Sequence, residues 1–106
     1  MLLIDGDGAR VEPAPELWGL PAATAERRLR DRLGAAWRVA AIGPAGERLV
    51  RYATVSHDGR HAGRGGLGAV LGSKNIKAVA VRGAGVKPPL ADPQAVLAAA
   101  RDLRER

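Results

Sequence analysis

Apolar residues form short runs separated by turn residues, which is typical of a small domain built from short strands and helices. At the amino terminus, Leu2-Leu3-Ile4 and residues 9–12 flank Asp5-Gly6-Asp7-Gly8. Asp-Gly steps favour tight turns, so this segment predicts a β-hairpin.

The next third of the chain predicts a helix followed by two strands. Leu29 and Leu33 lie four residues apart within residues 24–33, and Gly34 follows as a helix terminator. Residues 37–42 are a short apolar run that predicts a strand. Pro44 and the glycines around it indicate a type I turn, and the alternation over residues 49–55 predicts the returning strand.

The last part of the chain predicts two helices and a strand. We expect helical turns over residues 66–74, after a glycine-rich segment, and a strand buried on both faces over residues 76–81. Asp92-Pro93 is a typical helix start, preceded by a linker containing Gly83, Gly85, Pro88 and Pro89.

This order predicts an α+β fold with a mixed or antiparallel sheet and two or three helices. The 106 residues are enough for one domain with a modest core. We assign residues 1–86 to that domain and residues 87–106 to a linker and a C-terminal helix. Aromatic residues are scarce, so Trp18 and Trp37 are predicted to be large side chains within the core.

Charge and composition narrow the functional classes. A formal net charge of +6 favours anionic partners, but the basic residues are spread along the chain, so we disfavour nucleic acid. The chain has no cysteine and therefore supplies no thiolate to a metal cluster. It shows no apolar run of membrane-spanning length and no signal-peptide pattern, so we expect a cytoplasmic protein without a membrane partner.

The glycine-rich segment is the strongest candidate for ligand binding. Its five glycines (Gly63, Gly65, Gly66, Gly68 and Gly72) allow main-chain N–H groups to approach an anionic or planar ligand. The spacing formally matches a dinucleotide-binding loop, but the acidic residue required about 20 positions later is missing. The order of residues around Lys74 likewise departs from a P-loop.

Other candidates for chemistry are weaker. His57 and His61 have the spacing of two metal ligands on a helix, but Asp58-Gly59 between them is typical of a turn. This favours two loop histidines with at most hydrogen-bonding roles. Glu47 could serve as a catalytic carboxylate. No nucleophile, base or second acid can be paired with it from spacing, so no catalytic residue is assigned.

Several motifs in order resemble the tungsten-containing aldehyde:ferredoxin oxidoreductase family. They are Trp18-Gly19, Ile42-Gly43-Pro44-Ala45-Gly46-Glu47, Asp58-Gly59-Arg60 and the segment from Ala62 through Gly-Ser-Lys-Asn-Ile-Lys-Ala to Val81. The resemblance covers the later half of that family's N-terminal domain. The fold it implies is an incomplete domain that forms a saddle under a tungsten or molybdenum bis-pyranopterin cofactor.

The same resemblance implies a site and a reaction. In the family, aldehyde is oxidised to carboxylate and electrons leave through a [4Fe–4S] cluster to ferredoxin. Arg60, His61, Gly63 and Arg64 match the loop that contacts the pterin, although His61 replaces a small residue. Guanidinium groups and main-chain N–H groups suit pterin phosphates.

The departures from the family limit the expected function. The cluster cysteines and catalytic groups of the family lie in later domains, and an earlier half-domain with further pterin contacts is also missing from this sequence. We therefore expect a fragment or split piece of a larger oxidoreductase, which is not catalytic alone. Its partners would be the remaining oxidoreductase domains or a second copy. The alternative is a non-catalytic scaffold or a phosphate-binding interaction module.

Overall fold

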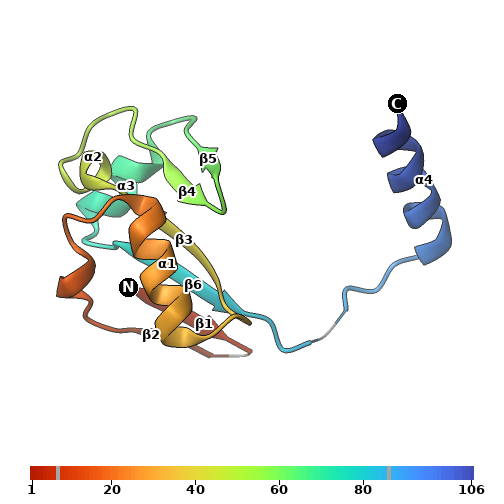
Figure 1. Ribbon diagram of the computed structural model, residues 1–106, viewed down its shortest axis with the longest axis horizontal. Helices are drawn as coiled ribbons and strands as arrows, with labels where there is room; N and C mark the ends of the chain where they lie inside the picture. Colours follow the sequence, from red (N-terminus) through yellow and green to blue (C-terminus); the bar gives the residue numbers. More distant parts are fainter. Residues whose placement is uncertain (7, 86) are drawn as a thin grey trace.

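A computed structural model describes residues 1–6, 8–85 and 87–106 of the chain. In the described residues, six strands form one sheet in the order β2-β1-β6-β3-β4-β5. Helix α1 lies across the strands, and α2 and α3 lie together near one end of the sheet (Figure 1). The elements are β1 (Leu2–Asp5), β2 (Gly8–Val11), a 3₁₀ turn η1 (Pro15–Leu17), α1 (Ala22–Leu33), β3 (Arg38–Ile42), α2 (Pro44–Glu47), β4 (Val55–His57), β5 (Arg60–Ala62), α3 (Leu67–Ser73), β6 (Ala78–Arg82) and α4 (Pro93–Glu105).

The sheet is mixed. Strand β6 lies between β1, with which it is parallel, and β3, with which it is antiparallel, so that Leu3, Ala80 and Val39 form one row. The other described pairings are antiparallel. The predicted α+β class is confirmed. The described residues form four α-helices where two or three were expected, partly because Pro44 starts a one-turn helix where a simple turn was predicted.

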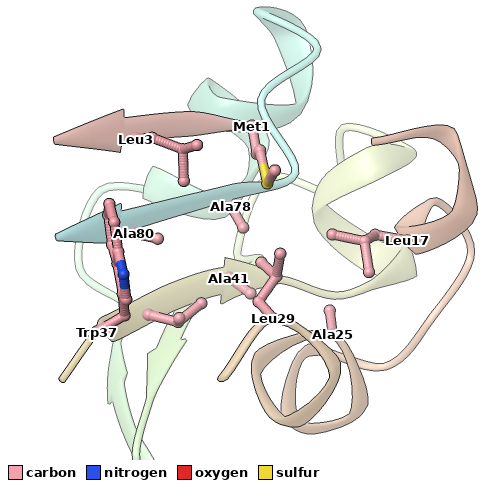
Figure 2. Packing of buried hydrophobic residues seen from close by; sticks show 10 residues of the cluster. Met1, Leu3, Leu17, Ala25, Leu29, Trp37, Ala41, Ala78 and Ala80 are labelled. Carbon is pink, nitrogen blue, oxygen red and sulfur yellow. The ribbon is translucent and has the colours of Figure 1, made fainter. Parts of the chain in front are cut away.

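The main core lies between one face of the sheet and α1. Leu29 and Ala25 on α1 face Leu3, Ala41 and Ala80 on the strands, and Leu17 lies at one end of this cluster (Figure 2). Trp37 is buried as predicted, at 4% exposed. Since the strand residues of this cluster are mostly small, the helix can pack closely against the sheet.

The opposite face of the sheet is only partly covered. Helices α2 and α3 contact β3 and bury Ile42 at one end of this face. We call the remainder the open face: it consists of Leu2, Ile4, Ala40, Val79 and Val81, which strand alternation places together. None belongs to the described core cluster, and Val81 is 40% exposed. The prediction that this strand is buried on both faces is therefore wrong at Val81.

The predicted strand over residues 49–55 is also wrong except at its last residue. Leu49, two residues after the end of α2, adopts a left-handed conformation with φ of 59°, and its N–H donates to the Gly46 carbonyl oxygen. Val50 N–H similarly donates back to Ala45. These turns hold the chain away from the sheet until Val55.

Trp18 does not lie in the core, because 42% of it is exposed beside η1. It lines an apolar groove with Met1, Pro13 and Pro15. Short η1 turns Leu17 inward instead, and this leucine occupies the position in the core that we expected for Trp18.

Helix α4 stands away from the sheet (Figure 1). Asp92 caps its first turn by accepting from the N–H groups of Gln94 and Ala95, and none of its residues is buried. The predicted hairpin turn includes Asp7 and the predicted domain boundary falls at Val86; both residues lie outside the described ranges. Among the described helices, none combines the length and apolarity required to cross a bilayer.

Candidate cofactor loop

The candidate site is formed by the β4–β5 hairpin and the loop that follows it. Asp58 and Gly59 form a two-residue turn with φ of 49° and 73°, the left-handed conformations that join tightly paired antiparallel strands. Arg60 and His61 lie on β5, the edge strand of the sheet, whereas Gly63 and Arg64 lie in the loop between β5 and α3. The structure thus brings the four predicted site residues to one edge of the molecule.

The side chains of Arg60 and His61 point to opposite faces of β5, because neighbouring residues of a strand alternate. His61 forms a cross-strand hydrogen bond between its Nδ1 atom and Ser56 Oγ, at 2.8 Å. Arg60 and Arg64 are both exposed. Within the described residues, neither guanidinium pairs with a carboxylate, so both remain available to an anionic ligand.

The glycine-rich segment divides into an exposed half and a buried half. Gly63, Arg64 and Gly65 are exposed, and within the described part of the chain their N–H groups donate to no protein acceptor. Gly65 has φ of 79°, and open space lies where a Cβ would be. This half presents main-chain donors to solvent and fits the phosphate-bearing ligand that the family resemblance implies.

The buried half of the segment serves packing. A Cβ on Gly66 would overlap the carbonyl oxygen of Arg51, and one on Gly72 would overlap that of Gly46. A Cβ on Gly68 would lie 2.6 Å from the carbonyl oxygen of Thr54. These three glycines allow α3 to pack backbone to backbone on α2 and on the preceding turn.

The two histidines occupy separate hydrogen bonds instead of converging. His57 Nδ1 lies 2.7 Å from the Val39 carbonyl oxygen, which can only accept, so Nδ1 carries the proton. His61 contacts Ser56, and both histidines lie on strands. These contacts agree with the predicted hydrogen-bonding roles, but the predicted loop positions are wrong, because the turn is formed by Asp58 and Gly59 alone and both histidines lie on the strands beside it. Among the described residues, no three His, Asp or Glu side chains are grouped in a way that could hold a metal ion.

Glu47, the candidate carboxylate, lies in a buried ion pair. Its carboxylate accepts from Lys77 Nζ and, at 2.9 and 3.0 Å, from the N–H of Gly19. Lys77 also donates to the Leu20 carbonyl oxygen at 2.7 Å. Glu47 thus joins three of the sequence motifs in the interior, and this set of partners gives it a structural role.

The chain matches the aldehyde ferredoxin oxidoreductase, N-terminal domain, over residues 1–83. It belongs to this family. The matched range contains the whole sheet and the candidate loop and ends before α4. The resemblance in the motifs is therefore confirmed as family membership.

Relatives with curated names are much longer than this chain. It is 41% identical over 103 residues to the tungsten-containing aldehyde ferredoxin oxidoreductase of Pyrococcus furiosus, covering 95% of this chain and 17% of the relative. The enzyme of the same name from Thermococcus kodakarensis is 40% identical over the same proportions. The WOR-like subunit of aliphatic sulfonate oxidoreductase from P. furiosus is 35% identical over 86% of this chain and 17% of that protein.

A solved structure shares the fold. The active site complex BamBC of benzoyl coenzyme A reductase, in complex with 1,5-dienoyl-CoA, matches with a TM-score of 0.74 and 41% identity. The match covers 77% of this chain and 13% of that one. The chain therefore spans less than a fifth of the length of these proteins.

Two residues important to the site's framework were not singled out from the sequence. Lys77 interrupts the apolar run that leads into β6, and Glu26 shares a helical stripe with Leu29 and Leu33, three and seven residues later. A charged residue at an apolar position is the signal that could have identified each one. Glu26 is 8% exposed and Lys77 is 2% exposed.

Proposed function

We propose that this chain supplies one cofactor-contacting loop to an aldehyde ferredoxin oxidoreductase-type enzyme and is not catalytic by itself. Membership of the N-terminal domain family and the tungsten-containing relatives support this function. The observation that carries it is the exposed segment Gly63-Arg64-Gly65, whose N–H groups and Arg64 guanidinium bond to no partner among the described residues.

The ligand in this proposal is a tungsten or molybdenum bis-pyranopterin. Arg60 and Arg64 would bind phosphate or ring heteroatoms, and the N–H groups of residues 63–65 would donate to the same anionic groups. When bound, the cofactor supplies two-electron chemistry for oxidising an aldehyde to a carboxylate. The chain has no cysteine, so the ligands of the [4Fe–4S] cluster, from which electrons pass to ferredoxin, would belong to other parts of the enzyme.

The partner in this proposal is the rest of the oxidoreductase, or a second copy of the chain. The open face supports a partner, because strands that are apolar on both faces normally lie between two layers. Relatives about six times as long contain further segments that could form the missing layer.

The loop can be tested with pyrophosphate as a probe of phosphate recognition. We expect pyrophosphate to shift the amide resonances of residues 63–65 in NMR titrations, and Arg64→Ala to weaken this binding about tenfold. Arg28→Ala on α1 removes the same charge elsewhere and serves as the control. Equal weakening by both substitutions would show that net charge, and not the loop, attracts the anion.

A second measurement separates the oxidoreductase role from a phosphate-binding module. Chain purified from its own host is analysed for tungsten, molybdenum and pterin. Stoichiometric metal and pterin are expected for the proposed function. Pyrophosphate binding by a preparation without either one would favour the interaction module.

A further inference from the structure

Glu26 is an unusual buried acid on α1. Although charged, it is only 8% exposed, and its two carboxylate oxygens lie 3.1 and 3.3 Å from the N–H of Asp58. Arg30, one helical turn later, is 3.8 Å from Glu26 and 3.9 Å from the Asp58 carboxylate. Helix α1, which packs on the core face of the sheet, thus contacts the tip of the β4–β5 hairpin directly.

The hairpin tip has few other supports. Strand β4 pairs with β3 at two positions, Ala41 with Ser56 and Ile42 with Val55, and β5 pairs only with β4 in the described sheet. The hydrogen bond between His57 and Val39 lies before the turn. Beyond residue 57, two described contacts join the tip to α1: the N–H of Asp58 donates to the Glu26 carboxylate, and the Arg30 guanidinium lies 3.9 Å from the Asp58 carboxylate, beyond hydrogen-bond length.

A groove beside the hairpin tip makes the bond between Glu26 and Asp58 important for the position of the tip. A groove of about 570 Å³ lies between α1 and the turn, lined by Glu26, Arg27, Arg30, Asp58 and Gly59 among others. A turn bordering a groove of this size has room to move. Without the bond from Asp58, tight packing would not prevent movement of Arg60, two residues further along the chain.

We infer that Glu26 is a positioning residue, which holds the hairpin tip and thereby sets the place of Arg60 in the proposed cofactor loop. This inference rests on the proposed function for the role of Arg60, whereas the contact between Glu26 and the tip is independent of any ligand. Small displacements of an anion-binding side chain weaken binding strongly, so a remote carboxylate can control affinity.

The experiment compares Glu26→Ala, Glu26→Gln and Glu26→Asp with the control Glu16→Ala. Glu16 is an exposed acid that pairs with Arg32 at 3.1 Å, away from the hairpin. Amide hydrogen exchange of residues 58–60 is measured by NMR against amides of β1 and β6 as an internal reference. Affinity for pyrophosphate is measured on the same samples.

We expect Glu26→Ala to speed exchange at residues 58–60 about tenfold without changing β1 and β6, and to weaken pyrophosphate binding severalfold. Glu26→Gln retains a carbonyl acceptor and should restore most of both properties. Glu26→Asp withdraws the carboxylate by one methylene at little change in volume, so it provides the test if the alanine variant does not fold. The control should resemble the wild type.

Exchange at residues 58–60 that is unchanged in both Glu26→Ala and Glu26→Asp overturns the inference. Faster exchange with an unchanged pyrophosphate affinity also overturns it, because the tip would then not position Arg60. If the wild-type chain binds no pyrophosphate, the proposed function loses its support, and exchange at the tip alone decides whether Glu26 holds the hairpin.

Discussion

Lys77 and Glu47 form an ion pair in the interior of the protein, with 2% and 5% of their side chains exposed. The pair joins the residue before β6 to the end of α2. The N–H of Gly19 and the carbonyl oxygen of Leu20 complete the hydrogen bonding, so the connector before α1 is tied to the same point. No buried side-chain polar atom among the described residues lacks a partner.

Removing one member of this pair should be costly. Lys77→Met leaves the Glu47 carboxylate buried without its cation, and we expect a loss of about 3–5 kcal/mol in the free energy of unfolding. Urea denaturation measures this loss. Lys74→Met, at an exposed position nearby, is the control and should change stability by less than about 0.5 kcal/mol. Similar losses in the two variants would contradict the role of the ion pair.

The contact between α2 and α3 predicts a strong effect at Gly72. The Cβ of Gly72→Ala would overlap the Gly46 carbonyl oxygen, so the two helices must separate, and we expect a loss of about 3 kcal/mol. Thermal unfolding followed by circular dichroism measures the effect. Gly83→Ala places its Cβ in open space and should be nearly neutral. An equally stable Gly72→Ala variant would show that the helices are not in backbone contact.

Asp5 and Arg82 predict a measurable titration. A hydrogen bond from the Arg82 guanidinium lowers the pKa of Asp5 below its ordinary 3.8, with the charges of Arg82 and Arg10 adding to this effect, and together they outweigh desolvation. The lowered pKa means that the pair stabilises the fold above pH 3.8. This contribution is lost as the pH falls through the folded-state pKa. NMR titration of Arg82→Gln should return the pKa of Asp5 towards 3.8, and an unchanged value would contradict the pairing.

The isolated position of α4 predicts that its removal is harmless to the domain. A lone helix of 13 residues is marginal in water, and no residue of α4 is buried. Deleting residues 87–106 should therefore leave the midpoint of thermal unfolding within about 2 °C of the full chain. A decrease of more than about 5 °C would show that α4 packs on the domain in solution.

The sequence predicted those helices and turns whose backbone conformation is set by residues close together in the chain. The period of Leu29 and Leu33, the Asp92-Pro93 start and the Asp58-Gly59 turn all specify backbone conformation within a few residues, and each element forms as expected. The hairpin and loop bearing Arg60 and Arg64 could be located for the same reason. Their binding role remains a prediction.

Contacts between segments far apart in the chain explain why the other sequence predictions were wrong or incomplete. The alternation after residue 49 resembles a strand, but this segment lies against the start of α3 instead, where the N–H of Gly68 donates to the Ala53 carbonyl oxygen and Gly66 lies close to that of Arg51. Trp18 is exposed because Leu17 takes the inward position. Glu26 and Lys77 resemble surface charges until the partners that bury them, Asp58 and Glu47, are known from the fold.

The open face should affect the solubility of the chain in a cell. When no partner covers it, this face is an apolar surface that favours association, formed by Leu2, Ile4, Val79 and Val81. Newly synthesised chains would then tend to aggregate through this face. The amount of soluble protein would depend on how soon another segment covers the face after synthesis. Solubility of the chain produced alone, compared with its production beside a covering segment, would measure that dependence directly.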